Sequence, residues 1–174
     1  MATPEESVDD IFHPGGRLRL DRFTEGAVQA LRESLRLAHE TRWDSLRSPH
    51  VFMGLLAVPD ASVLNWGERL QADLAKLLSQ FQELFHQEEG EDEAVLVLNR
   101  EFLSDNVIHL LRDAHNRAQD HRRAQVTPMD LLISLLTASN SIVAECFERI
   151  GVTAAKLTEL AVIAEHSGGE GGKK

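Results

Sequence analysis

The sequence predicts an all-α protein of eight helices, built from two copies of a four-helix repeat. The main observation is internal repetition, because residues 24–80 align without a gap with residues 104–160 and share twelve identical positions. Five of these positions hold Arg, Glu or Lys, which coincide by chance less readily than Leu or Ala. Repetition at a fixed offset is typical of a duplicated structural unit. The chain also lacks Tyr and has only 5% aromatic residues, which leaves a core of Leu, Ala, Val and Ile that favours helix.

The segments around this double unit suggest how the chain is divided. The first part carries Pro4, Pro14, Gly15 and Gly16 among acidic residues and has no lasting hydrophobic period, so it is predicted to be flexible. An acidic stretch separates the repeats, and glycines dominate the end of the chain. The predicted organisation is a flexible leader over 1–21, a double domain over 22–166 with repeat one at 22–86, an acidic connector at 87–98 and repeat two at 99–166, and a Gly-rich tail over 167–174.

The first helix of each repeat has the same start signal. Thr24 and Ser104 stand where a side-chain oxygen can accept from the free backbone N–H groups of a first turn. Each is followed by an acid, Glu25 or Asp105, which suits the positive end of the helix dipole. Matching start chemistry at the two ends of the offset supports the alignment.

The second helix is predicted to be the buried one. It begins at Ser48-Pro49 in repeat one and at Thr127-Pro128 in repeat two, where a cap residue precedes proline at the first helical position. The residues that follow are apolar on nearly every side of the helix. A helix with that pattern is typically surrounded by other elements, so the two second helices are expected at the centre.

The third helix is predicted near 61–69 in repeat one and near 141–150 in repeat two. Asp60 and Asn140 immediately precede these segments and are expected to be their caps.

The fourth helix is predicted near 72–85 and near 153–165. Gly151 separates it from the third helix in repeat two, because glycine readily takes the left-handed conformation that ends a helix. Repeat one has Gln71 at the equivalent position, so its two helices are expected to be less sharply separated.

Charge and cysteine content restrict the possible partners and compartment. A net charge of −10 argues against nucleic acid or an anionic membrane as a partner and favours a basic one. The single cysteine, Cys146, excludes an internal disulfide and fits a reducing compartment. The acidic N-terminal residues lack the apolar core of a secretory signal, and no apolar run approaches the roughly 20 residues that span a bilayer. We therefore expect a cytoplasmic protein.

The sequence contains no catalytic or metal-binding pattern, and no cofactor is predicted. His109, His115 and His121 are spaced so that successive rings point to different sides of a helix, and they are expected to be solvated. Cys146 has no neighbouring base and is expected to be a buried structural residue. The only Gly-Lys pair, Gly172-Lys173, lies outside any strand–helix context, so it is not a phosphate-binding loop. The chain is predicted to have no enzymatic activity of its own.

Trp43 is a candidate contact residue with two alternative explanations. Arg117, Arg122 and Arg123 form a basic cluster near the end of the first helix of repeat two, and Trp43 occupies the matching place in repeat one, next to Arg42. An exposed Trp beside Arg is typical of binding hot spots. Alternatively, the ring folds over the end of its own repeat, and the sequence does not decide between the two.

Several of these residues together resemble the N-terminal domain of the Clp/Hsp100 ATPases. That repeat typically opens with a Phe-Thr-Glu element and has a second helix like Thr-Glu-His-Leu-Leu-Leu-Gly-Leu-Leu. The similar segments are Arg22-Phe23-Thr24-Glu25, Ser48-x-His50-Val51-Phe52-Met53-Gly54-Leu55-Leu56 and, in the second copy, Val126-Thr127-Pro128-Met129-Asp130-Leu131-Leu132. The resemblance covers about residues 22–162 and implies a pseudo-twofold bundle of eight helices made of two Clp N-type repeats.

The resemblance implies a role in binding rather than in chemistry. N-domains of this family bind substrates or adaptor proteins for an attached ATPase ring. In some members, paired pockets at the starts of the first two helices bind phosphorylated arginine, with a Glu of the Thr-Glu-His element on the guanidinium. Pro49 and Met129 occupy that Glu position here, so the carboxylate partner of a guanidinium is missing. Generic peptide or adaptor binding is therefore expected instead of phosphoarginine binding.

Ligand contacts are predicted at the twin helix starts or in the apolar groove between the copies. The hydroxyls at the first helix starts could still hold an anion, and a histidine at a buried helix start could line a pocket mouth. The candidate binding residues are Thr24, Glu25, Trp43, Ser48, Pro49, His50, Ser104, Asp105, Thr127, Pro128 and Met129.

The predicted function is recruitment of unfolded or peptide substrates, or of an adaptor protein, to a Clp-type ATPase ring. Two alternatives remain. The chain could be the N-terminal part of a complete ATP-dependent unfoldase, which a reading frame that continues past Lys174 into a P-loop would indicate. It could also be a dedicated receptor for one partner helix, as in the disassembly of a secretion sheath.

Overall fold

The described part of the chain folds into eight α-helices, as predicted. The computed structural model describes residues 11–86, 97–139 and 141–172, and within these residues there are isolated β-bridges but no β-strand. The elements in chain order are η1 (Leu20–Arg22), α2 (Glu25–Glu40), α3 (Ser48–Ala57), α4 (Ala61–Leu70), α5 (Leu74–Leu84), η2 (Arg100–Phe102), α6 (Asp105–Asp120), α7 (Pro128–Thr137), α8 (Ile142–Glu148) and α9 (Ala154–Gly172).

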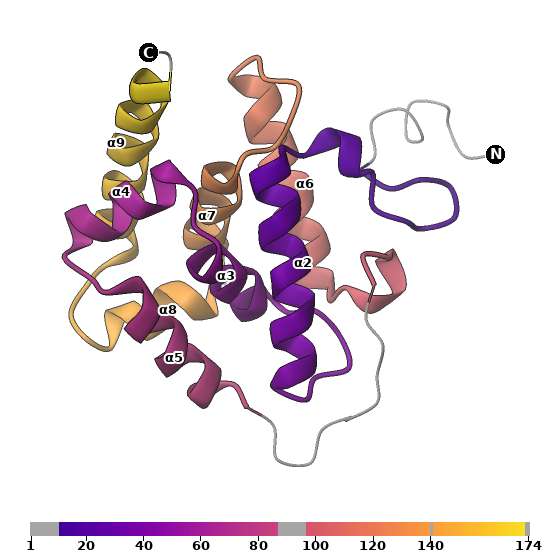
Figure 1. Ribbon diagram of the computed structural model, residues 1–174, viewed down its shortest axis with the longest axis horizontal. Helices are drawn as coiled ribbons and strands as arrows, with labels where there is room; N and C mark the ends of the chain where they lie inside the picture. Colours follow the sequence, from indigo (N-terminus) through magenta and orange to yellow (C-terminus); the bar gives the residue numbers. More distant parts are fainter. Residues whose placement is uncertain (1–10, 87–96, 140, 173–174) are drawn as a thin grey trace.

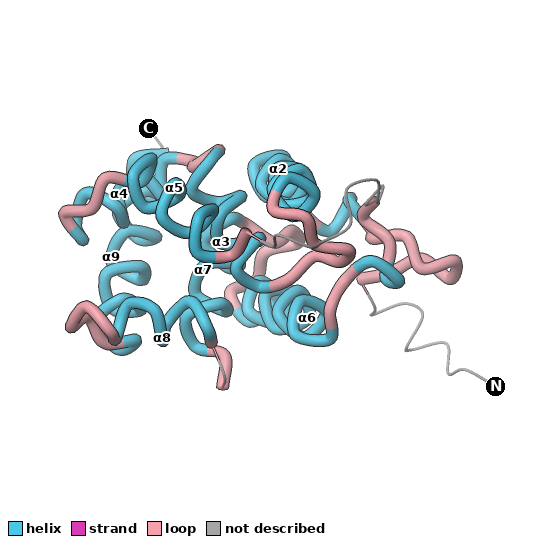
Figure 2. Tube along the Cα trace, turned by 90° about the horizontal axis from the view of Figure 1, so that it is seen from below, coloured by secondary structure: helices cyan, strands magenta, loops and turns pink. Residues whose placement is uncertain are grey.

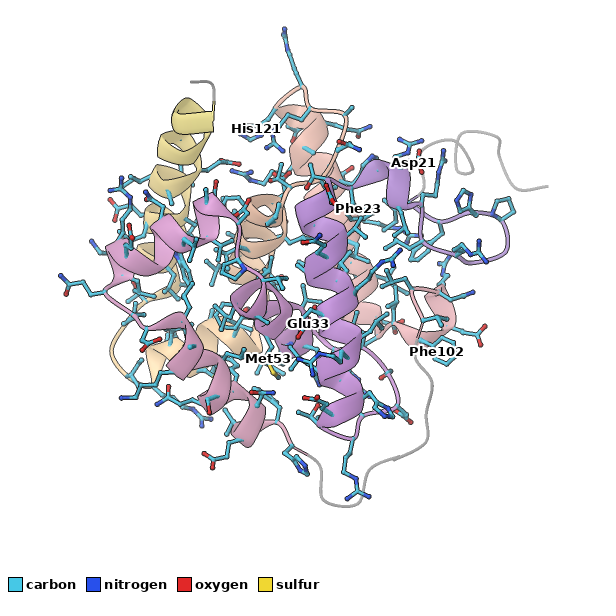
Figure 3. All side chains as sticks on the ribbon, viewed as in Figure 1. Asp21, Phe23, Glu33, Met53, Phe102 and His121 are labelled. Atoms are coloured by element: carbon cyan, nitrogen blue, oxygen red, sulfur yellow. The ribbon has the colours of Figure 1, made fainter. Side chains whose placement is uncertain are left out.

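The two second helices, α3 and α7, form the centre of the bundle. Every residue from Pro49 to Leu56 in α3 and from Pro128 to Leu136 in α7 is buried. The helices α2 and α6 pack on this pair from the outside, as Figures 1 and 2 show. In the same way α5 packs on α3 and α9 on α7. Met53 lies between the helices, whereas His121 lies at the periphery (Figure 3). The nearly uniform apolarity of the second helices thus predicted their position correctly.

The two repeats are interleaved at their helix starts. Phe23 forms an isolated parallel bridge with Val126, and Leu46 forms one with Leu103. Phe23 and Leu103 differ by 80 residues, as do Leu46 and Val126, so one bridge is the copy of the other. Each bridge joins residues of different repeats. The predicted pseudo-twofold relation is therefore present in the structure, and neither repeat completes its own helix starts.

The helices α2 and α3 cross at close range because Gly54 has no side chain. A Cβ at this position would lie 2.1 Å from Ser34 Oγ and 2.2 Å from Ala30 O. Ser34 Oγ itself donates to Ala30 O at 2.6 Å. In repeat two, Ser134 stands at the position of Gly54 and Ala114 at the position of Ser34. The hydroxyl is therefore on the second helix of repeat two, and both crossings consist of small residues.

The flexible leader predicted over 1–21 is wrong for residues 11–21. Ile11, Phe12 and Leu18 are only 1%, 4% and 1% exposed and belong to the hydrophobic core. A turn with Gly16 at a φ of 98° connects them, and Leu18 N–H donates to Leu98 O at 2.9 Å. Three apolar residues in such a short turn show no helical or strand period, which is why the pattern did not indicate them. Residues 1–10 lie outside the described residues.

Two predicted caps differ from the structure. Ser48 is not the cap of α3 but lies in its first turn, since Arg47 holds the N-cap position with extended backbone angles. In repeat two Thr127 caps α7 as predicted, and its hydroxyl accepts from the N–H of Asp130 at 3.1 Å. Asn140 lies outside the described residues, and Ser141 Oγ instead accepts from the first turn of α8.

The break between the third and fourth helices is as sharp in repeat one as in repeat two, contrary to the expectation. Gln71 adopts a left-handed conformation with a φ of 61°, equivalent to Gly151 with a φ of 91°. A non-glycine residue can take this conformation at some cost, so the break does not require glycine. The α9 backbone stays helical to Gly172, beyond the predicted end at 165, and most of the predicted connector, 87–96, lies outside the described residues.

We expect Gly54→Ala to destabilise the protein by about 2–3 kcal/mol, because the added methyl meets a backbone oxygen that cannot move away without separating α2 from α3. Urea unfolding followed by circular dichroism measures the loss. Gly15→Ala is the matched control, since a Cβ there meets nothing within 4 Å. Equal stability of the two variants would show that the crossing of α2 and α3 is not close.

Candidate functional site

The predicted contact residues gather at two junctions, each built from both repeats. We call the place where α6 begins beside α3 the α3/α6 junction, and the place where α2 begins beside α7 the α2/α7 junction. Ser104 N–H donates to Leu46 O at 3.0 Å at the first, and Thr24 N–H donates to Val126 O at 2.9 Å at the second. These bonds hold a helix start of one repeat against a helix start of the other.

The hydroxyls at both junctions serve as helix caps. Thr24 Oγ1 accepts from the N–H of Ala27, and Ser104 Oγ accepts from the N–H of Val107, each at 3.2 Å. The adjacent acids, Glu25 and Asp105, are exposed. The hydroxyl oxygens are therefore already engaged, and an anion at these helix starts would have to compete with them.

The α3/α6 junction is hollowed. A cavity of about 100 Å³ is lined by the starts of α3 and α6, by the loop before α3, by the end of α5 and by α8. Its lining residues are Trp43, Arg47, Ser48, Pro49, His50, Phe85, Ser104, Asn106 and Ile142. The wall is apolar and aromatic on one side and polar at the two helix starts.

His50 is a neutral structural group in this wall. Its Nδ1 accepts from the backbone N–H of Arg47 at 3.1 Å, so the ring proton must lie on Nε2. Nε2 lies 3.1 Å from Thr41 Oγ1, which donates its own proton to Leu37 O at 2.8 Å. Burial, together with the charge of Arg47, lowers the pKa of His50 from 6.5 to about 4. His50 thus fixes the start of α3 and carries no charge at neutral pH.

Trp43 adopts the second of the two alternatives that the sequence left open, and its role in binding stays a prediction. Its Nε1 donates to Phe85 O at 2.6 Å, so the ring does fold over the end of its own repeat. The ring also stands edge-on to His50 at 5.5 Å and lies under the Arg47 guanidinium at 4.9 Å. It remains half-buried and lines the cavity.

A second hollow of about 310 Å³ adjoins the first and shares Ser48 and Asn106 with it. One face of α6 contributes His109 and Asp113, one helical turn apart, and both side chains are exposed. The loop between α7 and α8 closes the far side with Ser139 and neighbouring residues. Together the two hollows offer an apolar wall next to a polar one with a carboxylate.

The α2/α7 junction is closed where the α3/α6 junction is open. Gly26 stands at the position equivalent to Asn106, and Pro128 at the position equivalent to Ser48. A Cβ on Gly26 would lie 3.4 Å from Pro128 Cγ, so the two helix starts are in contact. Met129 is 1% exposed. Pro128 and Met129, which were predicted to bind ligand, are therefore core residues.

A buried ion cluster stands behind the α2/α7 junction. Asp130 is fully buried and accepts from Arg117 Nη1 at 2.7 Å and from both terminal nitrogens of Arg123. Glu165 of α9 accepts from both terminal nitrogens of Arg117, at 2.8 and 2.9 Å. Thr127 adds its backbone N–H to Asp130 Oδ2 at 2.9 Å. The cluster joins α6, the loop before α7, α7 and α9.

The arginines decide the ionisation of both acids. Burial disfavours the Asp130 carboxylate, but the bonds from Arg123, Thr127 and Arg117 outweigh it and lower the pKa of Asp130 below its ordinary value. Burial likewise opposes ionisation of Glu165, and Arg117 lowers the pKa of that carboxyl. The basic cluster predicted from Arg117 and Arg123 is therefore neutralised internally.

The ion cluster has an uncharged counterpart in repeat one. Subtracting 80 from each position gives the equivalents, and these surround the α3/α6 cavity or support its wall. Arg117, Arg123, Asp130 and Glu165 correspond to Leu37, Trp43, His50 and Phe85. His50 and Asp130 accept the same bond, from the backbone N–H of the residue three places before. The two repeats thus share this backbone bond, whereas the surrounding side chains are ionic in repeat two and uncharged in repeat one.

The structure brings only part of the predicted site together. Trp43, Ser48, Pro49, His50 and Ser104 line one cavity. Thr24, Glu25, Thr127, Pro128 and Met129 belong to the closed α2/α7 junction, and Asp105 is exposed beside the open one. The sequence did not indicate Asn106, His109 and Asp113 as lining residues. Their spacing of three and seven residues places them on one face of a helix, and this spacing could have indicated them.

The observed solvent exposure of His115 and Cys146 corrects two further expectations. His115 is 4% exposed rather than solvated, and Cys146 is half-exposed rather than buried. Burial nevertheless raises the pKa of Cys146, which disfavours its thiolate. Within the described residues no three His, Cys, Asp or Glu side chains are grouped to hold a metal ion.

No single helix in the described part of the chain is both long and apolar enough to cross a bilayer, and the bent pair α7 and α8 meets these criteria only jointly.

Comparison with known proteins relates this geometry to one fold. Residues 102–167 match the family model of the Clp repeat (R) N-terminal domain. The N-terminal domain of the caseinolytic protease-associated chaperone ClpD from Arabidopsis thaliana superposes with a TM-score of 0.64 at 18% identity, over 85% of this chain and 97% of that chain. This chain has the Clp N-domain fold. The Hsp104 N-terminal domain from Candida albicans agrees, with a TM-score of 0.65 at 14% identity over 80% and 89% of the two chains.

One structure of this fold contains a bound peptide. It is the complex of the ClpV N-domain with a VipB peptide, and the present chain superposes on it with a TM-score of 0.60 at 16% identity, over 84% of this chain and 89% of that chain. No curated protein sequence matches this chain significantly.

We expect His50→Asn to remove a pH dependence of stability between pH 6.5 and about 4. The folded pKa of His50 is lowered, so its contribution is complete above 6.5 and is lost as the pH falls towards the folded pKa, because the unfolded chain takes up the proton first. The shift corresponds to about 3 kcal/mol. Urea unfolding of both proteins across this range measures the difference, and parallel pH profiles would contradict the role of His50.

We expect Asp130→Asn to destabilise the protein by roughly 3–5 kcal/mol, because the partly buried arginines Arg117 and Arg123 lose one carboxylate. Thermal unfolding at neutral pH measures the loss. Glu33→Gln is the control, since the exposed pair of Glu33 with Arg36 on α2 contributes less than about 1 kcal/mol. A loss no greater than that of the control would mean that the cluster does not hold α9.

Proposed function

We propose that this chain is a non-catalytic recruitment domain that binds a peptide segment of a client or an adaptor protein at the α3/α6 junction, for delivery to a Clp-type ATPase ring. The observation that carries the proposal is the pair of adjoining hollows at this junction, with volumes of about 100 and 310 Å³. The Clp N-domain fold supports the same role, because a peptide is bound to the ClpV N-domain in one of its relatives.

The two hollows suit an extended peptide better than a compact small molecule. The apolar wall with Trp43, Phe85 and Ile142 can take one large apolar side chain. The polar hollow next to it can pair Asp113 with a cationic side chain and His109 with a polar one. A peptide with an apolar residue followed at a short distance by Lys or Arg would use both hollows, and large aromatic anchors dominate the energy of such interfaces.

The overall charge favours the same ligand. The chain has a net charge of −10, which accelerates association with basic segments and repels acidic ones. At the α2/α7 junction Pro128 lies in contact with α2. We therefore expect one peptide at the helix-start junctions of each chain.

Titration of a labelled, unfolded peptide rich in Leu, Lys and Arg tests the proposal. We expect binding that weakens as salt rises from about 0.01 M to about 1 M, because the Debye length falls from roughly 30 Å to roughly 3 Å. His109→Trp should fill the polar hollow and weaken binding about tenfold, whereas Gln29→Trp, the same change at the equivalent exposed position of α2, should leave it unchanged. Fluorescence anisotropy gives both affinities.

Two outcomes would contradict the proposal. One is equal loss of binding in the His109 and Gln29 variants, and the other is binding that does not respond to salt. Capture of one stoichiometric protein instead of many unfolded clients would identify a dedicated receptor and would leave the site assignment intact.

A further inference from the structure

A second apolar hollow lies between α5 and α8, away from the α3/α6 junction. It has a volume of about 520 Å³. Leu77, Phe81 and Leu84 line it from α5, and Cys146, Phe147 and Ile150 line it from α8 and the residues after it. We call it the α5/α8 groove. Figure 2 shows the backbones of α5 and α8 separated from each other.

The floor of the α5/α8 groove is aromatic and its rim is unusually apolar. Phe81 and Phe147 are nearly buried, with ring centroids 6.4 Å apart, and Phe52 supports both from below at 4.9 and 6.0 Å. Ile150 and Leu84 are 71% and 62% exposed, the highest values among the large apolar side chains of the described residues. The two apolar side chains that contact solvent most thus belong to the two walls of one groove. Such a patch marks an interaction surface.

The pseudo-twofold relation shows that this space is filled elsewhere in the same molecule. The pair equivalent to α8 and α5 is α4 and α9, and these two helices are among the most extensively packed in the structure, whereas α5 and α8 are not. Trp66 Nε1 of α4 donates to Leu157 O of α9 at 3.2 Å. Ala161 and Ala164 of α9 are fully buried. The groove is therefore an interface of this fold that is left open in one half.

Side-chain size explains why α5 stays apart from α8. Phe81 and Leu84 occupy the positions equivalent to Ala161 and Ala164. Two alanines allow α9 to approach α4 closely, whereas a phenylalanine and a leucine hold α5 away. The bulk that keeps the helices apart also supplies the apolar lining.

We propose that the α5/α8 groove binds one amphipathic helix of a partner protein, with large apolar side chains on one face and basic residues beside them. The groove has two helical walls and an apolar floor, which suits anchors at i, i+4 and i+7 of a helix. Among the described residues that line it, Glu83 is the only charged one, and the chain as a whole has a net charge of −10. The charge complement of this surface is therefore a basic helix.

This site goes beyond the proposed peptide site at the α3/α6 junction and does not depend on it. No lining residue is shared between the α5/α8 groove and the two hollows of that junction. The domain would therefore hold two ligands at once, an extended segment at the junction and a helix in the groove.

A synthetic helix tests the proposal on the full chain. The probe is a labelled peptide of about 15 residues, long enough to form helix, with leucines at i, i+4 and i+7 and lysines beside them. We expect Leu84→Ser together with Ile150→Ser to weaken binding about tenfold. Both side chains are mostly exposed, so the fold should persist, which circular dichroism checks. Leu64→Ser, at a half-exposed leucine of α4, is the matched control and should bind as the unchanged chain does.

Further measurements separate this site from its alternatives. Amide chemical shifts should change in α5 and α8, His109→Trp should have no effect, and the same peptide with glutamates in place of lysines should bind more weakly. Unchanged binding by the double variant, stronger binding of the glutamate peptide, or shifts confined to the α3/α6 junction would overturn the proposal. A concentration-dependent dimer that Ile150→Ser disperses would also overturn it, because the occupant would then be a second copy of this chain.

Discussion

The rest of the structure depends on two backbone hydrogen bonds by which each repeat holds a helix start of the other. We call this pair of bonds the crossed exchange. Val126 accepts from the N–H that precedes α2, and Leu46 accepts from the N–H that precedes α6. Each repeat therefore supplies the acceptor for a helix start of the other. A repeat on its own would leave these backbone groups unsatisfied next to a buried core, at a cost comparable to a lost hydrogen bond for each group. The duplication thus produced one cooperative domain and not two independent ones.

The exchange fixes where the junctions lie but leaves their side chains free to diverge. At one junction the four equivalent positions hold two arginines and two acids, and at the other they hold Leu37, Trp43, His50 and Phe85. The ionic version works only if every charge is paired, because a buried lone charge is strongly unfavourable. The uncharged set of repeat one can stand beside an open cavity, since neutral His50 needs only Arg47 and Thr41 as hydrogen-bond partners. For this reason the cavity lies beside the aromatic set.

Local chemistry explains which parts of the fold could be predicted. The starts of α2 and α6 depend on a cap and an acid within a few residues, and the sequence contains both, as it contains the apolar runs of α3 and α7. Only part of the ion cluster could be predicted. Arg117, Arg123 and Asp130 are near one another in sequence, but Glu165 lies on α9, far along the chain. Ile11 and Phe12 are buried by tertiary contact alone, and no period in their own segment reveals it.

Prediction of the candidate site from the sequence has the same limit, because it also depends on contacts between distant residues. Ser48, His50 and Ser104 were predicted from their places at helix starts, and they do line one cavity. Which of the twin junctions is open could not be predicted, because it depends on Gly26 against Pro128 in one copy and Asn106 beside Ser48 in the other. The residues of the first pair lie 102 positions apart, and those of the second pair lie 58 positions apart. Their contact follows from the crossed exchange, which leaves no local signal in the sequence.

One short stretch of the fourth helix contributes to both asymmetries of the molecule. In α9 the stretch holds Ala161, Ala164 and Glu165, and in α5 and its C-cap it holds Phe81, Leu84 and Phe85. The small residues let α9 lie against α4, and the acid completes the ion cluster. The large residues keep α5 away from α8, and Phe85 adds a wall to the α3/α6 cavity.

The substitutions in this stretch therefore account for the packing of α9 on α4 and for the separation of α5 from α8. A symmetric double repeat with two copies of the α9 stretch would have alanines in both fourth helices, and the α5/α8 groove would lose much of its apolar lining. Two copies of the α5 stretch would remove Glu165 and with it the bonds that tie α9 to Arg117 of α6. One copy of each stretch combines a closely packed half with a half that exposes large apolar side chains.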